Sequence, residues 1–161
     1  MEELYTTWKA IGVAGGDLSF FQDFFVKFYQ AFIEGDRWLQ YLNGVKTTLL
    51  VTALALILGI VLGVLVAMLR TAHDQQRPGH RNPILAVLNL ICKVYVTVIR
   101  GTPMMVQLLI MGFVIFASSR NFTMIGTLTL GINSGAYVSE IVRGGLMSVD
   151  KGQMEAGRSL G

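Results

Sequence analysis

The chain has 161 residues, of which 53% are hydrophobic and only 14% are charged, and its mean hydropathy is +0.57. A soluble domain carries about 25% charged residues, so this composition excludes an ordinary soluble protein and indicates a membrane protein. The formal net charge of +3 gives no support to nucleic-acid binding. The single cysteine, Cys92, excludes an internal disulfide, and no His or Cys cluster has metal-ligand spacing, so we expect no metal and no cofactor.

Residues 1–43 form a segment that we expect to lie outside the cytoplasm or at the membrane surface. The start MEELYTTWKA carries two acids where a cleavable signal peptide has positive charge, so we expect the N-terminus to be retained. Between Leu18 and Ile33, phenylalanine recurs every four residues and polar residues fill the other side. This pattern predicts an amphipathic helix whose aromatic face lies at the outer membrane surface or packs on neighbouring protein.

Three uncharged stretches are long enough to cross about 30 Å of hydrocarbon, namely residues 47–69, 101–119 and 121–139. Residues 83–99 are also apolar, but they contain Lys93, whose insertion would cost roughly 2.5–3.5 kcal/mol. We therefore expect residues 83–99 to lie along the cytoplasmic surface and to lead into the second span.

The distribution of Lys and Arg selects an orientation for these three spans. With the N-terminus outside, most basic residues near the membrane fall in the cytoplasm, as short cytoplasmic loops require. The prediction is an all-α integral membrane helical bundle in the cell membrane, with three transmembrane helices and an N-terminal interfacial amphipathic helix. Its membrane domain comprises residues 44–161.

In the first span, small residues recur on one helical face and permit a close helix contact, which would suit an interface between subunits; the alternative is that glycine is simply frequent in membrane helices. The small residues are Ala55, Gly59, Gly63 and Ala67. In the second span, Gly101 and Pro103 predict a helix break, because proline lacks a backbone donor and clashes with the carbonyl of residue 99. Gln107 adds a polar amide one turn further on.

The third span carries the densest set of polar residues. Asn133, Tyr137 and Glu140 fall on one helical stripe, and Ser134 lies beside it. Polar residues in a membrane face a bundle interior or a transport route, so Gln107, Asn133, Ser134 and Tyr137 are candidates for a substrate path. Hydrogen bonding between helices is the alternative. For Glu140 we favour an ion pair with Arg143 at the cytoplasmic mouth.

The last ten residues, GQMEAGRSLG, are polar and bounded by Gly152 and Gly161. Together with RGTPMMVQLL and the first-span block starting at Gly44, they resemble the polar amino-acid uptake family of ABC transporter permeases over roughly residues 44–161. The family signature reads Glu-Ala-Ala, three residues, Gly, and here its second alanine is Gly157. Family members continue beyond this loop with two further spans, so we expect the chain to be an N-terminal fragment.

The resemblance implies a membrane-spanning permease subunit of an ATP-driven amino-acid importer. The implied partners are a second permease subunit in a homo- or heterodimer, two cytoplasmic ABC ATPases and an extracytoplasmic amino-acid-binding protein. By the same resemblance, the ATPase contact comprises Gly152, Gln153, Glu155, Ala156, Gly157 and Gly161. No GxxxxGK[ST] loop is present, so we expect ATP hydrolysis on a partner rather than in this chain. The alternative function is a non-transporting membrane scaffold that recruits a soluble protein through this loop.

Overall fold

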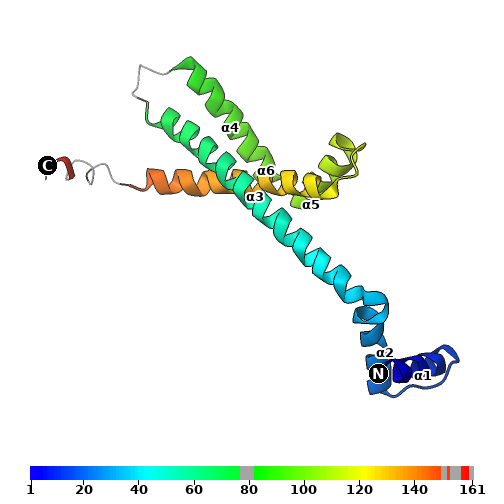
Figure 1. Ribbon diagram of the computed structural model, residues 1–161. Coiled ribbons are helices and arrows are strands. Elements are labelled where there is room, and N and C mark those ends of the chain that lie inside the picture. Colours follow the sequence, from blue (N-terminus) through cyan, green and yellow to red (C-terminus); the bar gives the residue numbers. More distant parts are fainter. Residues whose placement is uncertain (77–81, 150–151, 153–156, 160–161) are drawn as a thin grey trace. The chain divides into compact units, whose positions relative to one another are not determined.

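The computed structural model describes residues 1–76, 82–149, 152 and 157–159, and every regular element in these ranges is helical (Figure 1). Two compact units divide the chain, Met1–Leu49 and Leu50–Gly161. The first unit contains α1 (Glu2–Val13), α2 (Phe20–Phe32), the short η1 (Glu34–Asp36) and the start of α3 (Arg37–Asp74). The second contains the rest of α3, then α4 (Pro83–Gly101), α5 (Met104–Ile110), the π-helical turn η2 (Met111–Ile115) and α6 (Phe122–Met147).

The first unit is a helical hairpin that packs through aromatic rings. Ser19 and Gln22 form a reciprocal capping box that starts α2. The Tyr5 ring stacks on Tyr29 with centroids 4.2 Å apart, and Trp8 meets Phe25 edge-on at 5.4 Å. The amphipathic helix expected between residues 18 and 33 is therefore present, and one side of it packs on α1.

An ion pair ties α1 to the turn that leads into α3. Lys9 Nζ lies 2.6 Å from Glu34 Oε1, and this hydrogen bond holds the pKa of Glu34 below its ordinary value and that of Lys9 above. Gly35 adopts φ +64°, a left-handed conformation that glycine tolerates without strain, and α3 then begins at Arg37. The expected domain boundary at residue 43 therefore falls inside a continuous helix.

The second unit is organised around a close approach of α3 and α6. All four small residues of the predicted stripe in α3 are buried, as is Thr71 one turn further on. A Cβ on Gly63 would lie only 2.6 Å from the Cβ of Val138 in α6, and one on Gly131 would lie 2.5 Å from Leu58. Packing of small residues that lets backbones approach is the main source of helix association in lipid. The predicted close contact is confirmed, and it lies within the chain.

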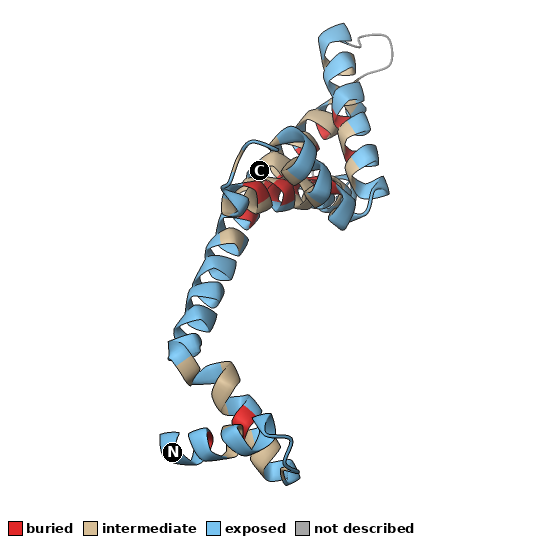
Figure 2. Cartoon of the chain, turned by 90° about the vertical axis from the view of Figure 1, so that its right-hand side faces the viewer, coloured by how far each residue is buried: buried red, intermediate tan, exposed pale blue. Residues whose placement is uncertain are grey.

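Other helices of this unit complete a small core. In Figure 1, α6 passes across α3, and α4 runs back beside the C-terminal part of α3, where Asn89 Nδ2 lies 3.1 Å from His73 Nδ1. The Tyr95 hydroxyl of α4 donates a 2.5 Å hydrogen bond to the Ile132 carbonyl of α6. Figure 2 shows the buried positions of this unit gathered where the helices meet. Large apolar side chains elsewhere on these helices are exposed, as expected for surfaces that face lipid.

The helices depart from the expected spans between residues 83 and 119. Residues 101–119, expected as one span, contain only a short apolar helix from Met104 to Ile115, because the backbone breaks at Thr102 and Pro103. At 1.5 Å per residue that helix is about 18 Å long, too short to cross a bilayer alone. Residues 83–99 instead belong to α4, a regular helix started by Asn82, whose side chain accepts from the Ile84 amide.

By length and composition, two helices in the described part of the chain qualify as membrane-crossing, one at Glu34–Asp74 and the other at Pro83–Gly101. The expectation that residues 83–99 are too polar to cross is therefore wrong on this measure, and Lys93 is exposed on α4. Helix α6 is longer than the expected span at residues 121–139. It is not one of these two helices, because its Asn, Ser, Thr and Gly residues lower its mean hydropathy.

The α3–α6 contact makes a testable prediction about stability. In Gly63→Ala, the new methyl group collides with Val138 and with the Gly135 carbonyl oxygen 3.0 Å away, and overpacking of this kind costs about 1–3 kcal/mol. We expect the melting temperature of the purified protein in detergent to fall by about 3 °C or more. The matched control is Gly126→Ala in α6, where the added Cβ meets open space. Equal melting temperatures for the two variants would contradict the close packing.

Candidate functional site

The break between α4 and α5 is closed by the side chain of Gln107. Pro103 has no N–H, so the Ile99 carbonyl four residues earlier lacks its helical partner. The Gln107 Nε2 atom donates a 2.7 Å hydrogen bond to that carbonyl oxygen. The same amide also donates to the carbonyl of Thr102 at 3.1 Å and to its hydroxyl at 2.8 Å. A polar side chain thus satisfies backbone that the break sets free, as non-helical backbone at membrane depth requires.

Gln107 also joins this break to α6. Its Oε1 atom accepts a 3.0 Å hydrogen bond from Asn133 Nδ2, and the whole residue is only 8% exposed. The two predicted path residues with carboxamide side chains are therefore brought together. Every polar atom of Gln107 is paired, so in this conformation its amide is part of the helix packing and is not open to solvent.

The other two predicted path residues lie apart from this amide pair. Ser134 faces α3, where its side chain lies 2.8 Å from the position of a Cβ on Gly59. Tyr137 is exposed, and the Arg100 guanidinium lies 5.3 Å from the centre of its ring. The polar stripe of α6 is thus divided between contacts with α3, α4 and α5.

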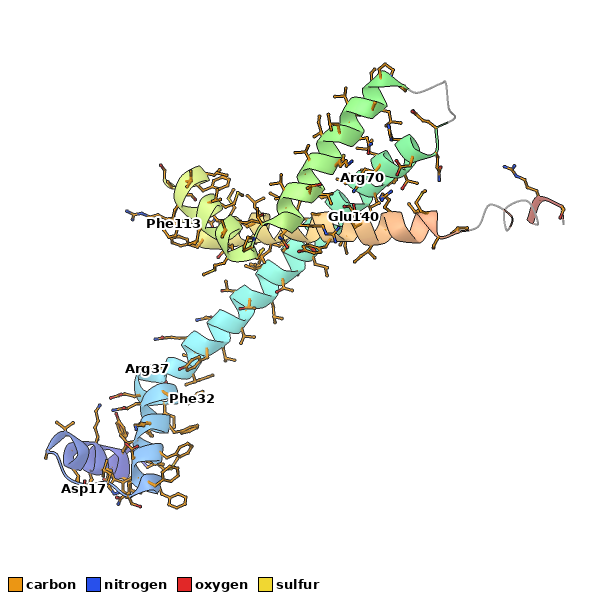
Figure 3. All side chains as sticks on the ribbon, turned by 180° about the vertical axis from the view of Figure 1, so that it is seen from behind. Asp17, Phe32, Arg37, Arg70, Phe113 and Glu140 are labelled. Atoms are coloured by element: carbon orange, nitrogen blue, oxygen red, sulfur yellow. The ribbon has the colours of Figure 1, made fainter. Side chains whose placement is uncertain are left out.

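Charged side chains from three helices form a second cluster near the ends of α3 and α6 (Figure 3). Glu140 is hydrogen-bonded to Arg70 of α3, and its other carboxylate oxygen lies 3.9 Å from Arg100 of α4. Arg143 pairs with Asp74 at 2.7 Å. The expected pair between Glu140 and Arg143 is therefore wrong, because each side chain reaches a partner on a neighbouring helix.

This ion-pair cluster contains functional candidates that the sequence reasoning missed. Arg70 directly follows the first uncharged stretch and Asp74 lies four residues further on, and neither is among the predicted site residues. The sequence offered one signal, which is charge complementarity: the stretches at residues 47–69 and 121–139 are each followed by charges of both signs, and buried charges require partners. The cluster links the cytoplasmic end predicted for α3 to the last turns of α6.

An apolar cavity of about 240 Å³ lies beside the helix break. Its walls come from α4, α5, η2 and α6, and polar atoms contribute little to them. They include Ile99, Gln107, Met111, Ile115, Thr129 and Ile132. The cavity offers free space next to the broken segment, and single π turns such as η2 interrupt regular helices frequently at functional sites.

The predicted ATPase contact is only partly covered by the structure. Gly152 and Gly157 are in helical conformation, and a Cβ on Gly157 would meet nothing within 4 Å. Four further predicted residues lie outside the described residues, namely Gln153, Glu155, Ala156 and Gly161. Among described residues, no group of three or more His, Cys, Asp or Glu side chains is arranged to hold a metal ion.

Comparison with known proteins bears on this arrangement. Residues 84–161, which contain the helix break, the amide pair and the terminal loop, match the family model described as "Binding-protein-dependent transport system inner membrane component". A relative from Rickettsia prowazekii, provisionally named glutamine transport system permease protein GlnP, is 38% identical over 122 residues, which cover 74% of this chain and 51% of that protein.

The glutamine transport system permease protein GlnP of Escherichia coli K12 is 40% identical over 82 residues, which cover 47% of this chain and 36% of that protein. Among solved structures, the crystal structure of an amino acid ABC transporter with histidines aligns with a TM-score of 0.56 and 35% identity, covering 76% of this chain and 56% of that one. The chain thus spans about half the length of the first relatives that it matches. Residues 84–161 are thus similar to the family of binding-protein-dependent transport system inner membrane components.

Proposed function

We propose that this chain is part of the membrane-spanning permease of an ATP-driven importer of polar amino acids. The observation that carries the proposal is the partly buried amide pair of Gln107 and Asn133 at a broken helix, inside the segment that matches the permease family. Polar groups are expensive in a membrane, and discontinuous helices are where transporters place substrate and ion sites. A non-transporting scaffold would need neither feature.

The names of the relatives support a proposal for the substrate class. The relatives reported above carry the name of a glutamine permease, and the solved structure is that of an amino acid transporter. We propose a polar amino acid such as glutamine as cargo, with Gln107, Asn133, Ser134 and Tyr137 in the path or its wall. In the conformation described, the side-chain amides of Gln107 and Asn133 bond each other beside the cavity. We propose that α5 moves against α6 to expose these amides to the substrate.

We also propose a membrane topology with the N-terminus outside and the terminal loop in the cytoplasm. The three crossings are α3, the interrupted pair α4 and α5 with η2, and α6. Treating α4 and α5 as one broken crossing keeps the number of crossings odd and places Arg70 and Arg143 on the cytoplasmic side. Arg100 is tolerated near the break because Glu140 and the Tyr137 ring lie beside it.

The terminal loop is proposed as the contact with the ATPases. Glu155 is an acid able to make a charge-assisted hydrogen bond to a partner, and the loop follows α6 closely. The pairs of Arg143 with Asp74 and of Glu140 with Arg70 bind the end of α6 to α3. A displacement of the loop would therefore reach both helices. Two cytoplasmic ATPases, a second permease subunit and an extracytoplasmic binding protein complete the proposed assembly, with ATP hydrolysed on the ATPases.

Uptake measurements test the proposed path. In Gln107→Leu, the Ile99 carbonyl and the Asn133 amide lose their partners, and each unsatisfied buried group costs about 1–3 kcal/mol. We expect labelled glutamine uptake to fall about tenfold in cells that depend on the encoding gene, while the ATPase still co-purifies. Gln30→Leu on α2 is the control and should leave uptake unchanged. Normal uptake after separate replacement of all four path residues would contradict the proposal.

Coupling to the ATPases makes a different prediction. Replacing Glu155 with Gln removes the negative charge from the proposed contact, so we expect substrate-stimulated ATP hydrolysis to drop several-fold. Glu3→Gln in α1 is the matched control, since it removes the same charge far along the chain from the loop. Hydrolysis that still responds fully to substrate in an assembled Glu155→Gln complex would show that the contact is elsewhere.

A further inference from the structure

The aromatic side chains of α2 are divided between two faces of the helix. Phe25 and Tyr29 turn toward α1, where they contact Trp8 and Tyr5, and Val26 between them is buried. The remaining phenylalanines point away from α1 and are exposed. This second set is called the phenylalanine ridge, and it consists of Phe20, Phe21, Phe24, Phe28 and Phe32. Packing against the rest of the unit therefore accounts for only one of the two aromatic faces.

Three rings of the phenylalanine ridge are stacked in a row, and the rings of Phe20 and Phe21 meet edge-on at the start of the helix. The Phe28 ring lies 6.4 Å from that of Phe24 and 4.9 Å from that of Phe32. Phe24 is 61% exposed. One aromatic side chain can bury about 150–250 Å², and these five are 43–79% exposed, so together they leave open about as much apolar surface as the largest patches on soluble proteins. Apolar patches of this size mark sites that bind another protein or a membrane.

The ridge continues into the helix that leads toward the membrane. The Phe32 ring lies 5.2 Å from that of Tyr41, in the first turns of α3. Beyond Tyr41, the exposed side chains Leu42, Val45 and Leu49 extend the apolar surface along α3. Aromatic rings followed by an apolar helix are the pattern of a membrane–water boundary. The lipid that surrounds α3 in the proposed crossing therefore fits the surface of the ridge as well.

The polar edge of α2 fits the same placement. Lys27 pairs with Asp23 at 2.7 Å on the side of the helix next to the ridge, and the Lys27 side chain is 72% exposed. Residues 1–49 contain more acidic than basic side chains. They offer no excess of positive charge that would favour anionic headgroups, so burial of apolar rings would drive the binding.

We propose that the phenylalanine ridge inserts into the boundary between headgroups and acyl chains of a phospholipid bilayer, so that α2 lies along the membrane surface beside the start of α3. The proposal rests on α3 crossing the bilayer. Its consequence is an anchor that sets the depth of the first span, with α1 held on the side of α2 away from the ridge.

Site-directed spin labelling of the full chain in phosphatidylcholine nanodiscs tests this anchor. Cys92 is the single cysteine, so a Cys92→Ala background accepts one label at a time. Labels are placed at Phe24 and Phe28 on the ridge, at Lys27 as the matched polar control, and at the exposed Ile57 inside α3. Collisions with apolar oxygen and with a water-soluble nickel chelate report the depth of each label.

We expect the ratio of oxygen to nickel accessibility to be about threefold higher at positions 24 and 28 than at position 27, and highest at position 57. A ridge that is equally open to nickel as position 27, while position 57 remains deep, would overturn the anchor and leave α3 as a span. Labels on the ridge that are shielded from both reagents would show that protein, such as a second copy of the chain, covers it. A shallow position 57 would contradict the membrane crossing itself.

Discussion

The close approach of α3 and α6 is the constraint on which the second unit depends. Lipid removes the hydrophobic drive for helices to associate, so packing of small residues must supply it. Gly59 and Gly63 on one helix and Gly131 and Gly135 on the other leave no room for side chains at the contact. This contact sets the position of α6, and the position of α6 brings Asn133 to Gln107 and Glu140 to Arg70. The polar groups that we assign to transport are thus placed by residues with almost no side chain.

Satisfaction of backbone polar groups explains why the broken helix is tolerated. The break would leave the Ile99 carbonyl without a donor in a region without water, and the Gln107 amide supplies that donor. The same side chain also accepts a hydrogen bond from Asn133. Moving Gln107 would therefore break hydrogen bonds both at the helix break and at the contact with α6. A segment held by side-chain hydrogen bonds can change partners more readily than a regular helix, which suits the change of conformation that the proposed transport requires.

Much of this arrangement could be predicted from the sequence, because spacing on one helix is a local property. The small-residue face of α3 and the break at Gly101 and Pro103 both follow from that spacing and from the chemistry of proline. Spacing on one helix does not reveal partners on other helices. The sequence therefore predicts a pair of Glu140 with Arg143, whereas the structure pairs Glu140 with Arg70. Counting uncharged residues also joined residues 101–119 into one stretch, since the count measures polarity and takes no account of the break in the helix. The Tyr95 contact with α6 left no pattern at all.

The proposed permease differs from a scaffold that only recruits a soluble partner because it must move an amino acid across the membrane. Proteoliposomes containing the product of the encoding gene, its second permease subunit and its ATPases provide the most direct measurement. With the binding protein outside and ATP inside, we expect accumulation of labelled glutamine that stops when either ATP or the binding protein is omitted. An assembled complex that hydrolyses ATP and accumulates no polar amino acid would contradict it.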